Sequence, residues 1–348
     1  MAYAILCILG LGILMAVHEG GHFLVARLFK MRVIKYSIGF GPVLWSKKPE
    51  GSDTTYQIAL LPFLAYVQIA GMNPHEEIDH DDKASYANAS WAGRFLTIVA
   101  GPLANYLFAV VVFFFLLLVA GRPNGIDGLK IGMIAPHGAA EHAQVHIGDE
   151  VKSIEGKEMK DWQEMRSAIE AHKGVEMSMV VQRDGKPVTL KVTPSKDEGR
   201  IGIGPKELRR SVSITEATKD ALVEPPRVAA SFVVGFGRLI TRKEKLELKG
   251  PVGIVEEAQS QMKMGMERGI EFFAILSIYI CVFNLIPFPA LDGGRLAFLL
   301  YEFLARRRPD AKIEARVHMV GLLAMLTLFV PLFIVELWKL GAKLFLKG

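Results

Sequence analysis

Residues 2–29 read AYAILCILGLGILMAVHEGGHFLVARLF, an apolar run whose second half holds the polar quintet HEGGH at 18–22. About 20 mostly apolar residues suffice to cross a bilayer as a helix, so the run predicts a membrane span. Ionisable residues inside such a span are costly and are rarely kept without a function. On a helix, positions i and i+4 share a face, so His18 and His22 can present ring nitrogens to one Zn²⁺ ion. This stretch therefore predicts both a membrane fold and a metal site.

The alternative for the same run is a secretory signal peptide. A signal peptide has a positively charged n-region and a small-residue cleavage site. The first four residues, MAYA, carry no Lys or Arg, and the apolar run leads directly into HEGGH. We therefore favour a membrane span.

The composition agrees with a membrane protein that also has a soluble part. Apolar residues make up 51% of the 348 residues and charged residues 22%, and most of the charge lies outside a few apolar blocks. This excludes disorder, a collagen-like chain and a disulfide scaffold, since there are two cysteines, each inside an apolar block. The net charge of +5 is too small to argue for nucleic acid as a partner.

Three further apolar stretches are long enough to span a membrane: about 95–120, about 270–300 with prolines inside it, and about 317–338. The short stretches 30–48 and 306–316 are rich in Lys and Arg, which places them on the cytoplasmic side. The sequence therefore predicts four spans with both termini outside the cytoplasm. The long region between the second and third spans then lies outside as well.

Residues 127–205 have a different texture, with short alternating strands and one helix candidate at 162–172. Small residues at 138–140, the sequence IGDEV at 147–151 and IEG at 154–156 resemble a bacterial PDZ domain. The resemblance implies a groove between a strand and a helix that takes a peptide as an added strand. The alternative is a β-rich domain that serves only as a spacer.

The region after this domain mixes charged and apolar residues. Residues 228–240 form an apolar run too short to span a membrane, so we expect a helix on the outer membrane surface. Residues 249–253, KGPVG, predict a turn that leads into the third span.

Glu19 adds chemistry to the two histidines. A carboxylate beside a zinc ligand can act as the general base that takes a proton from the attacking water. The quintet alone occurs by chance in soluble chains, and its position within an apolar block makes the functional interpretation the stronger one.

The candidate third ligand is Asp292, in the sequence NLIPFPALDGG at 284–294. It is the only carboxylate between Glu271 and Glu302, again within an apolar span. The two prolines before it break the helix, and irregular backbone at membrane depth is tolerated where it lines a cavity. A catalytic zinc ion usually has three protein ligands and one open position, which this residue would complete.

Together these elements resemble the site-2 protease family of intramembrane metalloproteases, specifically its bacterial branch with a PDZ domain outside the cytoplasm. The resemblance extends to AGPLAN at 100–105, similar to the family's Gly-Pro-x-x-Asn segment. It also includes GFGP at 39–42 with the strand-like residues 56–71, similar to the family's membrane-dipping β-hairpin. With the PDZ-like region and residues 249–252, it covers nearly the whole chain.

The family implies a role for each matching residue. His18, His22 and Asp292 would be the zinc ligands, Glu19 the general base, and Asn284 would lie near the substrate strand. Three residues of the second span would shape the core around the site: Gly101, Pro102 and Asn105.

The predicted fold is a polytopic α-helical membrane protein of about four transmembrane helices, with a membrane-associated β-hairpin and one extracytoplasmic PDZ domain of β-rich α+β type. The predicted segments are span one at 1–29, a cytoplasmic membrane-associated β region at 30–91, span two at 92–121, the PDZ domain at 127–205, surface helices and linker at 206–268, span three at 269–303, a cytoplasmic loop at 304–316 and span four at 317–341.

The resemblance implies regulated intramembrane proteolysis in a bacterial inner membrane, with the zinc site near the cytoplasmic side. Expected partners are single-pass membrane proteins, such as trimmed anti-sigma factors or remnant signal peptides, together with a PDZ ligand and the lipid bilayer. The best-studied relatives carry two PDZ domains, whereas this chain has room for one, which puts any size filter built from two domains in doubt.

Two other functions are alternatives to proteolysis. An inactive adaptor that only binds peptides would be expected to have lost Glu19 or a zinc ligand, and this chain has lost neither. A metal transporter would use His18, His22 and Asp292 as a transit site, but four spans with one buried carboxylate are few for a translocation pathway, and a transporter has no evident use for a PDZ domain.

Overall fold

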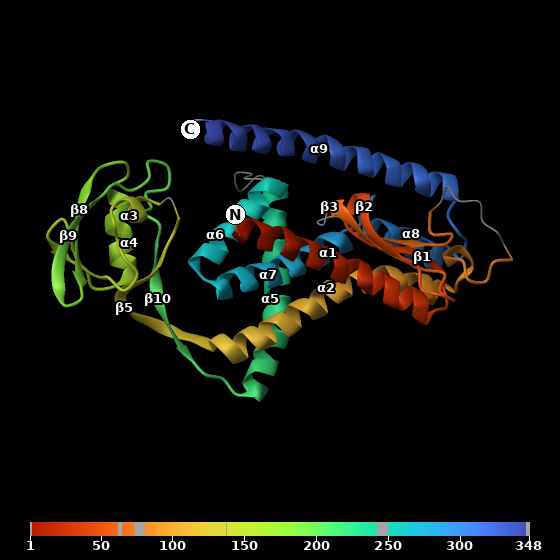
Figure 1. Ribbon diagram of the computed structural model, residues 1–348, viewed down its shortest axis with the longest axis horizontal. Helices are drawn as coiled ribbons and strands as arrows, with labels where there is room; N and C mark the ends of the chain where they lie inside the picture. Colours follow the sequence, from red (N-terminus) through yellow and green to blue (C-terminus); the bar gives the residue numbers. More distant parts are fainter. Residues whose placement is uncertain (1, 62–64, 74–80, 137, 242–249, 346–348) are drawn as a thin grey trace. The chain divides into compact units, whose positions relative to one another are not determined.

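The computed structural model describes residues 2–61, 65–73, 81–136, 138–241 and 250–345, and its ribbon is shown in Figure 1. The chain forms two compact units. We call them the membrane unit, made of Met1–Phe114, Lys219–Gln259 and Glu271–Gly348, and the β unit, made of Phe115–Thr218 and Ser260–Ile270.

Four of the described helices are long and apolar enough to cross a membrane, which confirms the predicted number of spans. Their apolar stretches are Tyr3–Leu28, Trp91–Ala120, Met266–Leu285 and Ala311–Lys339. The helices that carry them are α1 (Ala2–Leu28), α2 (Trp91–Ala120), α7 (Met266–Leu285) and α9 (Ala311–Phe345).

The predicted third span at 270–300 is divided into two helices. Helix α7 ends at Leu285, and α8 (Asp292–Ala305) begins only after a loop. The loop contains Pro287 and Pro289, which cannot donate the backbone hydrogen bonds that a continuous helix needs. Asp292 therefore stands at the first position of a new helix.

The membrane unit also contains a four-stranded sheet, in the order β2-β3-β1-β4. Its strands are β1 (Val33–Ile38), β2 (Phe40–Lys47), β3 (Thr55–Leu61) and β4 (Tyr66–Ile69), and a short 3-10 helix, Tyr86–Asn88, precedes α2. Of the two segments likened to a β-hairpin, residues 39–42 and 56–71, the first opens β2, which pairs antiparallel with β3. Within the second, β3 and β4 both pair with β1, which lies between them, and residues 62–64 lie outside the described residues. Strand β1 is parallel to β3 and antiparallel to β4, so β4 forms one edge of this sheet.

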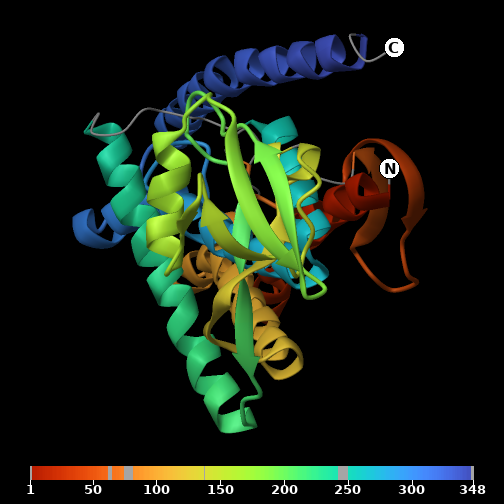
Figure 2. The same cartoon turned by 90° about the vertical axis from the view of Figure 1, so that its left-hand side faces the viewer.

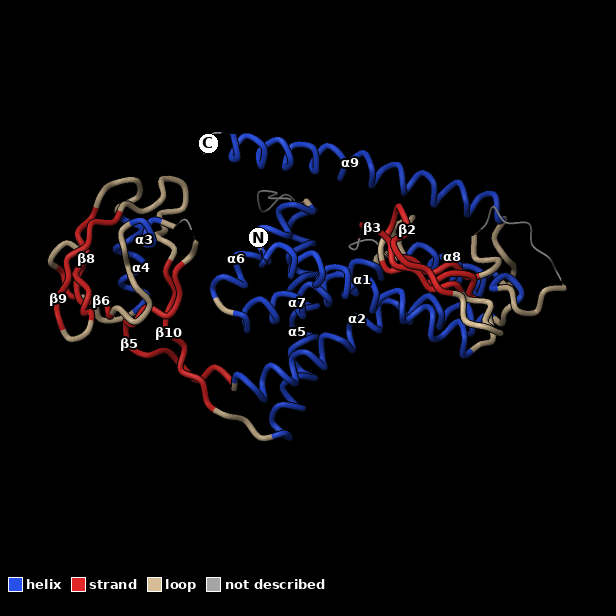
Figure 3. Tube along the Cα trace, in the orientation of Figure 1, coloured by secondary structure: helices blue, strands red, loops and turns tan. Residues whose placement is uncertain are grey.

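The β unit contains the second sheet, drawn in red with the first in Figure 3. The strand order is β10-β5-β6-β8-β9, and β7 pairs with β6. The elements are β5 (Arg122–Ile134), α3 (Ala139–His142), β6 (Glu150–Ile154), β7 (Lys157–Glu158), α4 (Trp162–Ala171), β8 (Met177–Arg183), β9 (Lys186–Val192) and β10 (Ile203–Arg210).

Local sequence explains two features of the β unit, which is drawn in yellow and green in Figure 2. Helix α4 begins where predicted, because the side chain of Asp161 accepts a hydrogen bond from the Glu164 N–H at 2.8 Å. The hairpin between β8 and β9 turns on Asp184 and Gly185, both at positive φ, as a two-residue turn of this hand requires. One face of α4 then packs into the apolar core through Met165 and Ile169.

Two expectations about the linker change. The helix expected at 228–240 is longer, since α5 runs over Ile214–Ile240 and includes two prolines. The expected turn at 249–253 is in part a helix start, because α6 (Pro251–Met264) begins at the proline, whose fixed φ suits the first helical position. Lys249 lies outside the described residues.

Candidate metal centre

Helix α1 brings the two histidines together. His18 and His22 are each 4% exposed, and their Nε2 atoms lie 3.3 Å apart. The two rings meet edge to face, with centroids 4.9 Å apart. This follows directly from their i, i+4 spacing on one helix, as the sequence predicted.

Helix α8 adds the carboxylate. The Oδ2 atom of Asp292 lies 3.1 Å from Nε2 of His18 and 3.4 Å from Nε2 of His22. The preceding loop folds tightly over the start of α8, so a Cβ at Gly293 would collide with the carbonyl of Ile286. Glycine directly after Asp292 is therefore required for the loop to bring the carboxylate to the histidines.

The three side chains fit a zinc ion. Zinc bound at ~2.0–2.1 Å by nitrogen and oxygen holds the ligand atoms of a tetrahedron about 3.3–3.4 Å apart. The three separations here run from 3.1 to 3.4 Å. Within the described residues, Asp292 Oδ2 is buried without a hydrogen-bond partner, and buried polar atoms of that kind call for a ligand. Two imidazoles and one carboxylate form a donor set found in catalytic zinc sites.

The outer ring nitrogens are also held. Nδ1 of His22 donates to the carbonyl of Thr97 on α2 at 2.7 Å, which leaves Nε2 free to ligate. Nδ1 of His18 lies 3.4 Å from the Asn105 amide, whose oxygen has no partner within the described residues. With the amide turned so that this oxygen faces the ring, Asn105 supplies the acceptor that a histidine ligating through Nε2 needs.

Helix α2 comes unusually close to this pair. A Cβ at Gly101 would collide with the ring of His22, so only glycine leaves room for that ligand. Asn105 is fully buried, and its backbone carbonyl accepts a hydrogen bond from the Ser277 hydroxyl on α7 at 2.9 Å. The segment AGPLAN thus lies directly behind the histidines.

Glu19 lies beside the metal ligands in a cleft of about 410 Å³. Its Oε2 atom accepts a hydrogen bond from the Val67 N–H of β4 at 3.0 Å. Glu19, His22 and Asp292 line the same cleft as the four residues of β4, Tyr66–Ile69. The carboxylate is therefore held next to both the candidate metal ligands and the edge of the sheet.

Asn284 is not brought to the cleft. Its side-chain amide donates to the carbonyl of Ile280 in its own helix at 3.0 Å, and it is absent from the described residues that line the cleft. Arg295, one turn after Asp292, lines the cleft and is absent from the residues predicted above. The signal that could have found it is the i, i+3 spacing from a candidate ligand at a helix start.

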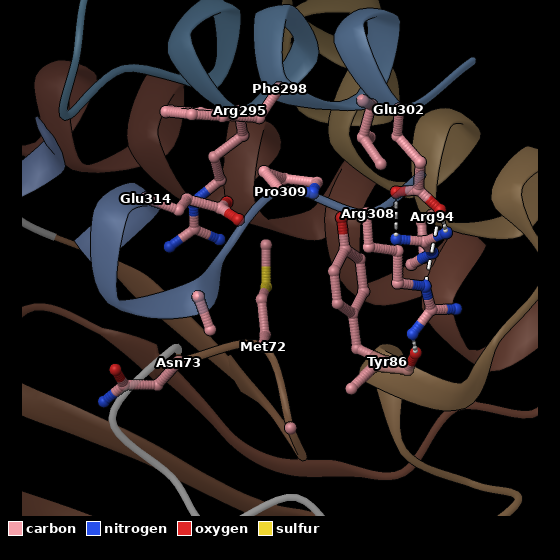
Figure 4. Close-up of a pocket in the computed structure, with 14 residues that line it drawn as sticks. Met72, Asn73, Tyr86, Arg94, Arg295, Phe298, Glu302, Arg308, Pro309 and Glu314 are labelled. Atoms are coloured by element: carbon pink, nitrogen blue, oxygen red, sulfur yellow. Dashed lines mark hydrogen bonds and ion pairs between the residues drawn. The ribbon is translucent and has the colours of Figure 1, made fainter. Parts of the chain in front are cut away.

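A second pocket, of about 150 Å³, adjoins the metal centre in the membrane unit and is drawn in Figure 4. Arg94 of α2 makes a bidentate ion pair with Glu302 of α8, at 2.6 and 2.9 Å. Arg308 also approaches Glu302, at 3.4 Å. The Arg94–Glu302 pair ties α8, the helix of Asp292, to α2.

Known proteins resemble this chain over most of its length. The model of the family described as Peptidase family M50 matches residues 6–328. A Fusobacterium nucleatum protein is 32% identical over 97% of this chain and 98% of its own length. The protein named zinc metalloprotease RasP of Geobacillus kaustophilus is 31% identical, covering 96% of each chain. The protein named regulator of sigma-W protease RasP of Bacillus subtilis is 27% identical, over 96% of this chain and 97% of its own length.

Proposed function

This chain belongs to peptidase family M50, the site-2 protease family, and is an intramembrane zinc metalloprotease, and on that premise we propose that it cleaves the transmembrane segments of single-pass proteins. The observation that carries the proposal is that His18, His22 and Asp292 converge beside Glu19. The histidines and Glu19 lie on α1, a helix apolar enough to cross a membrane, and Asp292 lies on α8, which follows another such helix, α7. Its substrates would be proteins such as trimmed anti-sigma factors or remnant signal peptides, cleaved in regulated intramembrane proteolysis.

His18, His22 and Asp292 would hold the zinc ion, and the outer contacts to Thr97 and Asn105 would fix the two rings. When bound, zinc supplies a Lewis acid that polarises the scissile carbonyl and acidifies water. Both ligand histidines are buried.

Glu19 would move the protons. Its carboxylate takes one proton from the attacking water as the carbonyl carbon is attacked, and returns it to the leaving amine as the C–N bond breaks. The Val67 N–H holds one carboxylate oxygen in place, so the side chain is oriented before substrate arrives. Positioned acid–base catalysis of this kind contributes about 10²–10⁴-fold to rate.

The outer edge of β4, which pairs with no further strand among the described residues, suits the substrate. A transmembrane helix hides its carbonyls in its own hydrogen bonds, so it must unwind before a peptidase can reach them. The Val67 N–H donates to Glu19 rather than to β1, so this N–H lies on the outer edge of the sheet. An unwound segment could add as a strand along β4, which would set its backbone beside Glu19 and the metal ligands.

We further propose that residues 127–205 are a PDZ domain. In the β unit, a groove of about 320 Å³ lies between α4 and residues 199–203, which is the kind of strand–helix groove that takes a peptide. We also propose the segment boundaries predicted from the sequence and the orientation of the spans in the membrane. Both termini and this domain would lie outside the cytoplasm of a bacterial inner membrane, with the zinc site near the cytoplasmic side.

The decisive experiment compares wild type with Glu19→Gln. Both proteins are purified in detergent and incubated with a single-pass substrate that lacks its outer domain. We expect wild type alone to cut within the membrane segment, and Glu19→Gln to keep its zinc while losing cleavage. Cleavage by Glu19→Gln at the wild-type rate would refute the assigned mechanism. Absence of cleavage by both, with one zinc per chain, would favour the adaptor function or a different substrate.

A further inference from the structure

Helix α9 lies directly against the loop that delivers Asp292. The loop runs from the end of α7 to the start of α8 and includes Pro289 and Ala290. A Cβ at Gly321 of α9 would collide with Pro289, so helix and loop are in the closest contact their backbones allow. Three residues earlier on α9, His318 makes a side-chain hydrogen bond to this loop.

Ala290 occupies an unfavourable backbone conformation. Its φ is +75°, in the left-handed region that residues with a side chain seldom adopt. The residue lies two positions before Asp292, so a change in its backbone would move the carboxylate. Something outside the loop must therefore hold this conformation.

His318 supplies that hold. The Ala290 N–H donates to Nδ1 of His318 at 3.0 Å. Because a backbone N–H can only donate, Nδ1 must be the unprotonated nitrogen, and the neutral ring carries its proton on Nε2. Nε2 lies 4.0 Å from the Glu314 carboxylate, and Glu314 in turn lines the neighbouring pocket of Figure 4.

The same ring also contacts the helix that follows the loop. The ring centroids of His318 and Phe298 of α8 are 5.7 Å apart. His318 therefore contacts the chain on both sides of Asp292, at Ala290 before it and at Phe298 after it.

We propose that His318 is a positioning residue for the metal centre: it accepts the Ala290 N–H, fixes the left-handed turn of the loop and thereby sets the place of the Asp292 carboxylate. This rests on the zinc site proposed above. His318 touches neither metal nor substrate in this assignment, and acts through the loop backbone.

The test measures zinc affinity by competition with a chelator, on full-length protein in detergent. The variants are His318→Leu, which removes the acceptor, and His318→Asn, whose Oδ1 lies as many bonds from the backbone as Nδ1 of histidine. Loss of outer contacts to metal sites costs about 10–100-fold in affinity. We expect about tenfold weaker zinc binding for His318→Leu, with Asn restoring affinity to within about twofold of wild type.

Gly321→Ala provides an independent arm if His318→Leu fails to fold, since it pushes on Pro289 without touching the histidine. It should also weaken zinc binding. Met319→Leu is the matched control, because that side chain is 48% exposed on the same helix, and it should bind zinc as wild type does.

Wild-type zinc affinity in both His318→Leu and Gly321→Ala would overturn the inference. Equal weakening by Leu and Asn at 318 would also overturn it, because the ring's bulk rather than its acceptor atom would then matter. A wild-type protein that binds no zinc would refute the proposed metal centre itself, which separates that failure from failure of this inference.

Discussion

The two units each bury a carboxylate, and they treat it in opposite ways. In the β unit, Asp149 is 1% exposed and accepts hydrogen bonds from Nε and a terminal nitrogen of Arg183, at 2.8 and 2.7 Å. It also accepts from the backbone N–H of His146 at 2.9 Å. In the membrane unit, Asp292 Oδ2 is buried and faces two imidazoles, but makes no hydrogen bond among the residues described.

The difference indicates that Asp149 stabilises the fold, whereas Asp292 is placed to bind a ligand. Burying a charge is expensive unless it is paired and hydrogen-bonded, and Asp149 meets both conditions within the protein. Burial raises the pKa of Asp149, but the bonds from Arg183 outweigh it, so the net pKa is lowered. A metal cation among them would supply a partner to Asp292 and both histidines at once.

The largest expected effect follows from removing the charge of Asp292. Asp292→Asn keeps the size of the side chain but removes an anionic ligand, so zinc affinity should fall by more than about a hundredfold, beyond the cost of losing an outer contact. Metal analysis of purified protein and chelator competition measure this. Hydrogen exchange of the β unit should not change, and an unchanged zinc content would place Asp292 outside the metal centre.

The corresponding change in the β unit should cost stability instead. Arg183→Met leaves Asp149 buried without its cation, which should lower the local free energy of unfolding by about 3 kcal/mol. Amide hydrogen exchange of β6 and β8 in the intact protein reports this as roughly hundredfold faster exchange, while zinc content stays at the wild-type level. Adding Asp149→Asn to the variant should recover much of the loss, and no recovery would show that the pair was not the cause.

A smaller effect is expected behind the metal ligands. Asn105→Leu fills nearly the same volume but cannot accept a hydrogen bond from the His18 ring, so zinc should bind about tenfold more weakly. Chelator competition checks this, with the exposed Leu107 replaced by Ala as a control on the same helix. Unchanged affinity would mean that the amide does not orient His18.

The smallest effect is a pH dependence confined to the β unit. The folded pKa of Asp149 is lowered, so its contribution to stability is full above the unfolded pKa of about 3.9 and is lost as pH falls through the lower folded value. Hydrogen exchange of β6 and β8, corrected for intrinsic rates, should therefore show stability falling below about pH 4. Arg183→Met should flatten this dependence, and an equally steep fall in that variant would assign it to other carboxylates.

Much of the candidate site could be predicted because it is local in sequence. His18, Glu19 and His22 lie on one turn of one helix, and the 3.6-residue period fixes their relation before any tertiary contact forms. Asp292 could be selected because it is the only carboxylate in a long apolar segment and follows prolines that break the helix. The place of the Asn284 side chain could not be predicted, because a family role does not specify the hydrogen bonds of a side chain. In this structure it donates to a carbonyl of its own helix.

The sequence by itself determined the apolar spans, the break before Asp292 and the helical spacing of the histidines, because each depends on the chemistry of neighbouring residues. Only the tertiary structure decided which backbone groups complete the site: the carbonyl of Thr97, the N–H of Val67 and the N–H of Ala290. Every residue except proline has the same N–H and every residue the same carbonyl, so no residue letter marks the ones that are used. The pairing of β3 and β4 with β1 was likewise decided by distant contacts, since strand patterning shows which residues alternate and not which strand lies beside them.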